Sequence, residues 1–176
     1  LHLYNKFNMD APPNMFVVEY ASRPDLASIF YEDVLMCAFY YGYPILIENN
    51  KYGIARYFET RGYDGYLMDR PEHLKSASTS SVRTKGIPSN SQDVIQSHAH
   101  AIEAYIHDHV GVNLETGEMG KMYFNRTLED WIGYKIDKRT KFDLTISSGL
   151  ALLAAQKAKK EKPMADFSDK RFFRRY

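Results

Sequence analysis

The chain has 176 residues, of which 44% are hydrophobic and 26% are charged, which is enough for one domain with a sizeable core. Its 23 basic side chains nearly cancel its 22 acidic ones, so the net charge alone points to no partner. The single cysteine, Cys37, excludes a disulfide framework within the chain and fits a reducing, intracellular compartment. No apolar run approaches the roughly 18 residues that a membrane span needs, so we expect no transmembrane segment.

The first twenty residues predict an antiparallel hairpin. Residues 1–7 alternate in polarity, residues 15–20 form a second β-type run, and residues 8–14 are typical of a loop. The first strand begins at residue 1 without a lead-in, which suggests a chain cut at its start.

The next segment predicts an amphipathic helix that ends at Gly42. Apolar residues recur at spacings of three and four over residues 26–41, Pro24 suits the first turn, and Ser22 is the expected cap. Because the second face is also apolar, we expect this helix to be well buried.

A short aliphatic run, Ile45 to Ile47, follows and ends at Glu48. Such a run predicts a strand buried on both faces of a parallel or mixed sheet. Ligands bind at the carboxyl ends of strands in open α/β sheets, so Glu48 is a candidate metal ligand, with Asn49 and Asn50 beside it. The alternative is a strand that simply ends in a polar turn.

Further elements are expected along the rest of the chain. They are a short helix over 54–61 closed by Gly62, a short strand over 66–68, a low-complexity loop over 76–81 and a helix over 89–109. His100, Glu103 and His107 share one face of the last helix. That face is either a metal surface or, as we favour, a solvated polar face.

The last part of the chain predicts two more helices. Residues 127–130 resemble a capping box, and the final helix over about 142–160 starts at Asp143. Asp143 either complements the helix dipole or faces Glu48 across the sheet. Two or three carboxylates that face one another can hold two divalent ions for attack on a phosphodiester, and oxygen ligands favour Mg²⁺ or Mn²⁺.

Basic side chains predict a salt-dependent contact with a phosphate backbone rather than sequence readout. There is no Walker or dinucleotide-binding glycine loop. The segment 157–176 has eight basic and three acidic residues together with four aromatic ones, which suits DNA or a docking surface, or is a plain solvated tail. The candidate DNA-binding residues are Lys51, Arg56, Lys75, Arg83, Lys85, Lys138, Arg139 and Lys141.

Four motifs in this order carry a resemblance to a known family. They are Glu19-Tyr20-Ala21-Ser22-Arg23-Pro24, Phe30-Tyr31-Glu32-Asp33-Val34, Ile47 to Gly53, and Tyr66-Leu67-Met68-Asp69-Arg70-Pro71. Together with Asp143-Leu144-Thr145, they make residues 1–155 resemble the C-terminal nuclease domain of the large terminase subunit of tailed bacteriophages.

The resemblance implies a single α/β domain over residues 1–160, with an RNase H-like mixed sheet flanked by helices, followed by a tail over 161–176. It implies an endonuclease that cleaves concatemeric double-stranded DNA with two Mg²⁺ or Mn²⁺ ions, in the cytoplasm of the infected bacterium, with the portal and the small terminase as partners. Glu48 matches the second acid and Asp143 the third, whereas the first is expected upstream of Leu1. The alternatives are a non-catalytic DNA- or protein-docking module, or another RNase H-like enzyme such as a resolvase or integrase.

Overall fold

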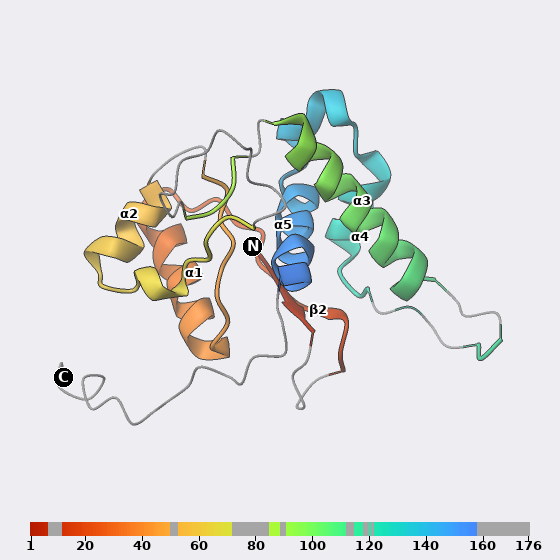
Figure 1. Ribbon diagram of the computed structural model, residues 1–176, viewed down its shortest axis with the longest axis horizontal. Helices are drawn as coiled ribbons and strands as arrows, with labels where there is room; N and C mark the ends of the chain where they lie inside the picture. Colours follow the sequence, from red (N-terminus) through yellow and green to blue (C-terminus); the bar gives the residue numbers. More distant parts are fainter. Residues whose placement is uncertain are drawn as a thin grey trace.

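The structure is a computed structural model, and it describes residues 1–6, 12–49, 53–71, 85–88, 91–111, 115–117, 120 and 122–157. It is a mixed α/β arrangement (Figure 1). The expected loop over 76–81 and the tail over 161–176 lie outside the described residues. So do Asn50, Lys51, Lys75 and Arg83.

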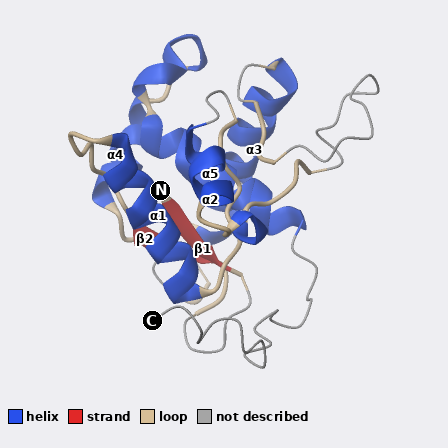
Figure 2. Cartoon of the chain, turned by 90° about the vertical axis from the view of Figure 1, so that its left-hand side faces the viewer, coloured by secondary structure: helices blue, strands red, loops and turns tan. Residues whose placement is uncertain are grey.

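The chain opens with the expected hairpin. Strands β1 (His2–Asn5) and β2 (Met15–Glu19) pair antiparallel, with His2 opposite Glu19 and an irregularity between Leu3 and Tyr4. Among the described residues these are the segments drawn as strands in Figure 2. The prediction from alternating polarity is therefore confirmed.

Helix α1 (Ala27–Tyr41) ends at Gly42, as expected, because Gly42 takes a left-handed conformation with φ of 67°. The expected cap is wrong, since Leu26 is the cap residue and no side chain bonds there.

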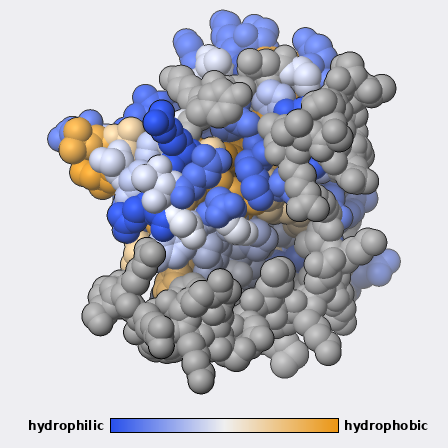
Figure 3. Space-filling view, turned by 60° about the vertical axis from the view of Figure 1, so that its left-hand side comes forward, coloured by the Kyte–Doolittle hydropathy of each residue, from blue (hydrophilic) through white to orange (hydrophobic). Residues whose placement is uncertain are grey.

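The expectation that α1 is well buried is also wrong. Only Val34, Leu35 and Ala38 are buried, whereas Met36 and Tyr40 are 56% and 81% exposed. The helix is packed along one stripe, and no described element covers its opposite face. Figure 3 brings the α1 side of the molecule forward and shows hydrophilic side chains over much of the described surface, with hydrophobic side chains at the left edge and near the centre.

The run Ile45 to Glu48 is extended but is not a continuous strand. Ile45 bridges Leu67 in parallel, and Glu48 bridges Ile87 in parallel. The bridges use hydrogen bonds from Ile45 N to Tyr66 O (2.7 Å) and from Ile87 N to Ile47 O (3.0 Å). The short strand expected over residues 66–68 is thus present only as an isolated bridge at Leu67, and the run from Ile45 to Glu48 pairs with two different segments.

Side chains of this run alternate between two cores. Ile47 is in the core with α1 and α2 (Gly53–Thr60), together with Phe58 and Leu67. Leu46 is in the core with α3 (Gln92–His109) and α5 (Asp143–Lys157), together with Ile87 and Leu153. The extended segments therefore form a middle layer between two helical layers, as Figure 1 shows.

The remaining elements complete the two helical layers. Helix α2 is followed by a left-handed Gly62 and the 3₁₀ turn η1 (Asp64–Tyr66), and α3 is capped by the Ser91 side chain on Val94 N. Helix α4 (Asn125–Gly133) and the 3₁₀ segment η3 (Ile136–Lys141) precede α5. Among the described residues, no helix combines the length and apolarity needed to cross a bilayer.

The capping box expected at residues 127–130 is wrong. Helix α4 starts two residues before Thr127, with Phe124 in the cap position, so Thr127 lies inside the helix and is fully buried. Its hydroxyl bonds to side chains of the hairpin instead of to its own helix start.

Candidate metal and nucleic-acid site

Glu48 lies at the end of the extended run, and its side chain is exposed. Successive side chains of an extended chain point to opposite faces, and Leu46 points into the core that contains α5. Glu48, two residues on, therefore belongs to the α5 side of the middle layer.

Asp143 is the first residue of α5. Its carboxylate is 65% exposed, and Oδ2 lies 2.7 Å from Nη2 of Arg23, which is 120 positions away in the sequence. Thus one carboxylate comes from the end of an extended segment and the other from the start of a helix packed on the same side. How closely the two carboxylates approach stays a prediction.

The first turn of α5 is fixed by α4. Oδ2 of Asp130 accepts hydrogen bonds from the backbone N (2.7 Å) and the hydroxyl (2.9 Å) of Thr145. The indole of Trp131 donates to the Ser148 hydroxyl at 2.9 Å. Because free amides at a helix start need such acceptors, this pairing sets the position from which Asp143 projects.

A buried polar chain links the hairpin to both helices. The Thr127 hydroxyl donates to Oε2 of Glu19 (2.5 Å), so it accepts from Nε2 of His2 (2.7 Å). Nδ1 of His2 is then the unprotonated nitrogen and accepts from the Ser147 hydroxyl at 3.0 Å. Burial lowers the pKa of His2 to about 3, so His2 is neutral and joins β1, α4 and α5. The sequence analysis missed this chain, because its members are far apart and carry no spacing motif.

The chemistry of the two carboxylates fits a divalent cation. Carboxylate oxygens are the ligands that Mg²⁺ and Mn²⁺ prefer, and the guanidinium on Asp143 shows that Oδ2 is accessible to a positive group. In the part of the chain that the structure describes, no group of three or more His, Cys, Asp or Glu side chains is arranged to hold a metal ion.

The histidines of α3 form a polar face. His100 Nδ1 lies 3.4 Å from Glu103, and the His107 side chain is 89% exposed beside Asp108. This agrees with the solvated face favoured from the sequence.

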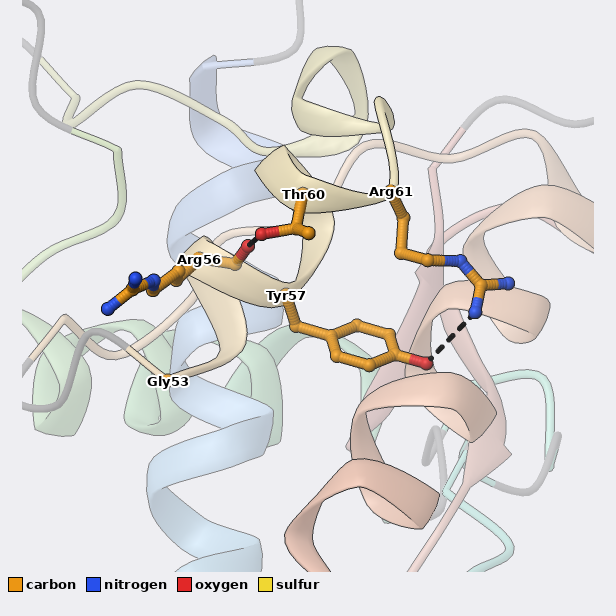
Figure 4. A pocket seen from close by; sticks show the side chains of 5 residues that line it. All are labelled: Gly53, Arg56, Tyr57, Thr60 and Arg61. Carbon is orange, nitrogen blue, oxygen red and sulfur yellow. Dashed lines mark hydrogen bonds between the residues drawn. The ribbon is translucent and has the colours of Figure 1, made fainter.

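A shallow groove along α2 carries an exposed candidate for a phosphate contact. It is lined by Gly53, Arg56, Tyr57, Thr60 and Arg61 (Figure 4). Arg56 is exposed and points to one side, whereas Arg61 points to the other, toward the Tyr57 hydroxyl at 3.4 Å. Arg61 also pairs with Glu32 at 3.3 Å, so of these two arginines Arg56 is the one directed away from the protein.

The other described candidates fall into two groups. Lys85 is engaged inside the fold, since Nζ contacts Asp69 at 3.1 Å and donates to Leu67 O at 2.9 Å. Lys138 and Lys141 are exposed on η3. Burial lowers the pKa of His98, and the charge of the half-buried Arg139 lowers it further. Lys85 therefore connects its own segment to the segment around Leu67. The exposed basic side chains of η3 are, after Arg56, the second place where a phosphate could bind.

Comparison with protein-family models, with curated proteins and with solved structures finds no match for this chain.

Proposed function

We propose that this chain is the nuclease region of a phage large terminase subunit, a metal-dependent endonuclease of RNase H-like fold that cleaves concatemeric double-stranded DNA during packaging. The proposal rests on the order of the sequence motifs around Arg23, Glu32, Glu48 and Asp69. The observation that carries it is the alternation of Leu46 and Glu48, which directs Glu48 to the layer where α5 starts with Asp143.

In this proposal Glu48 and Asp143 hold Mg²⁺ or Mn²⁺. Divalent ions at such a site supply an activated water and neutralise charge on the reacting phosphate. Asp130 and the His2–Thr127 chain keep the start of α5 in place. Arg56, Lys138 and Lys141 contact phosphates outside the cleavage point, and the portal and small terminase are the protein partners.

The direct test is a supercoiled-plasmid cleavage assay on the complete protein with Mg²⁺, Mn²⁺ or EDTA. Glu48→Gln and Asp143→Asn should each abolish metal-dependent cleavage while leaving thermal melting nearly unchanged, because both side chains are exposed. Glu59→Gln, an exposed carboxylate on α2, is the matched control and should cleave normally. Cleavage that survives both active-site substitutions would refute the proposal.

A second candidate function is a docking module without catalysis. It is favoured by the exposed apolar side chains of α1, among them Ile29, Met36 and Tyr40. If the complete protein shows no metal-dependent cleavage, and Met36→Glu abolishes assembly with portal or small terminase without unfolding the chain, this second function replaces the first.

A further inference from the structure

The ion pair between Arg23 and Asp143 differs from the ion pair between Arg61 and Glu32, which is less exposed and is supported by further contacts. Arg61 pairs with Glu32, bonds to the Tyr57 hydroxyl and lies over the Tyr57 ring, 5.7 Å from its centre. Arg23 is 88% exposed, and the interaction that the structure describes for it is the single contact of Nη2 with Asp143 Oδ2. A guanidinium has five N–H donors, so most of its capacity stays available.

The backbone that carries Arg23 is nevertheless held in place. Tyr20, three residues earlier, donates its backbone N to Leu1 O at 2.8 Å and its hydroxyl to Asp33 Oδ2 at 2.5 Å. Pro24, directly after Arg23, restricts the backbone further. The backbone at Arg23 is thus held near the start of α5. The guanidinium can break its contact with Asp143 by a rotation of the side chain alone.

The carboxylate that Arg23 contacts is the one that the proposed function assigns to a divalent cation. A guanidinium and a metal ion compete for the same oxygen, because each needs the Oδ2 lone pairs at short range. Ion pairs between solvent-exposed side chains contribute little to stability, so Arg23 is easily displaced. A displaced Arg23 keeps its forked donors beside the cleavage site, where they match two oxygens of a phosphate.

We propose that Arg23 is a phosphate-binding residue of the cleavage site, which rests on Asp143 in the metal-free protein and turns to the DNA backbone when that carboxylate binds a divalent cation. This inference rests on the proposed nuclease function. It assigns to Arg23 two exclusive contacts, one with Asp143 and one with the substrate phosphate.

The test compares Arg23→Gln with Arg61→Gln in the complete protein, using Mn²⁺ titrated calorimetrically and a short DNA duplex in Ca²⁺ as probes. Arg23→Gln should bind Mn²⁺ about threefold more tightly or better, because a competing cation is gone. It should bind the duplex about tenfold more weakly, because a forked phosphate contact is lost. Arg61→Gln should change neither quantity, and both variants should melt at the wild-type temperature.

Three results overturn the inference. Unchanged Mn²⁺ affinity in Arg23→Gln refutes the competition for Asp143, and unchanged duplex affinity refutes the phosphate contact. If Asp143→Asn binds Mn²⁺ as tightly as wild type, Asp143 is no metal ligand and the proposed function fails as well. The Asp143→Asn result therefore shows whether the metal site itself is wrong or only the role proposed for Arg23.

Discussion

The hydroxyl of Thr127 lies 2.7 Å from Nε2 of His2 and 2.5 Å from a carboxylate oxygen of Glu19, and it connects helix α4 to both strands of the hairpin. Thr127 is fully buried, and His2 is 6% exposed. A buried polar group that loses its hydrogen-bond partner stays removed from water without compensation. Loss of the Thr127 hydroxyl should therefore lower the free energy of unfolding by more than loss of an exposed hydrogen bond.

Thr127→Val should therefore destabilise the protein, although it preserves the shape of the side chain. It leaves the His2 N–H without its acceptor and Glu19 without its donor, at a cost of about 1–3 kcal/mol. Urea unfolding measures the change. Thr60 is an exposed threonine whose hydroxyl donates to the Arg56 carbonyl in the same helix, so Thr60→Val should change stability by less than about 0.5 kcal/mol. Equal losses of unfolding free energy in the two variants would show that the hydrogen bonds of Thr127 with His2 and Glu19 contribute no more to stability than an exposed hydrogen bond.

Gly86→Ala should be strongly destabilising for two reasons, a strained backbone and a steric clash. Gly42→Ala introduces only the backbone strain and therefore separates the two. Both glycines have a positive φ, of 70° and 67°, so each alanine costs about 1–2 kcal/mol for the left-handed backbone. A Cβ on Gly86 would also collide with the Ile47 carbonyl and lie 2.6 Å from Ile47 Cγ1, whereas around Gly42 there is open space.

We expect the loss from Gly86→Ala to exceed that from Gly42→Ala by at least about 1 kcal/mol, because overpacking adds to the backbone term. Denaturant midpoints of the two variants give the comparison. Equal losses would mean that the close contact between the segments around Ile47 and Gly86 is not maintained in solution.

Stability should fall as the pH drops from 6.5 toward 4. Burial lowers the pKa of His2 to about 3, and burial together with Arg139 lowers the pKa of His98 to about 4, both from 6.5. Below pH 6.5 these histidines are protonated in the unfolded chain but stay neutral in the folded chain. Each histidine therefore lowers the free energy of unfolding by up to about 2 kcal/mol at pH 5. Above 6.5 both states are neutral, and these two residues add no pH dependence.

His98→Leu provides the check on this pH dependence. Nε2 of His98 has no described hydrogen-bond partner, so the substitution removes a titrating group without breaking a bond from that nitrogen. The plot of unfolding free energy against pH should become shallower between 4 and 6.5. His107→Leu, at an 89% exposed position, should leave the slope as in wild type, and an unaltered slope in His98→Leu would contradict the buried, neutral state.

DNA binding by the complete protein should depend strongly on salt and only weakly on sequence, because the expected contacts are Lys and Arg side chains near phosphates. Arg56→Gln should reduce the slope of log affinity against log salt by about 1. Arg61→Gln, whose charge is directed to Glu32, should keep the wild-type slope. Fluorescence anisotropy over a salt series measures both, and a flat wild-type affinity would exclude a phosphate-tracking surface.

The sequence by itself determined the local elements. Alternating polarity located the hairpin, apolar spacing of three and four located α1 and α3, and Gly42 and Gly62 marked helix ends, because turns and caps depend on residues a few positions apart. The aliphatic run before Glu48 also predicted correctly that this segment lies between two layers, since both of its faces are apolar.

Only the tertiary structure decided which side chains meet. Thr127 has the sequence context of a helix cap, yet it is buried against His2, 125 positions away, and Arg23 reaches Asp143 across 120 positions. The apolar face of α1 was expected inside and lies outside, because burial depends on whether another element covers a face and not on the composition of that face. Periodicity describes the faces of one element, whereas long-range pairing depends on how all elements pack together, and no spacing within a single segment contains that information.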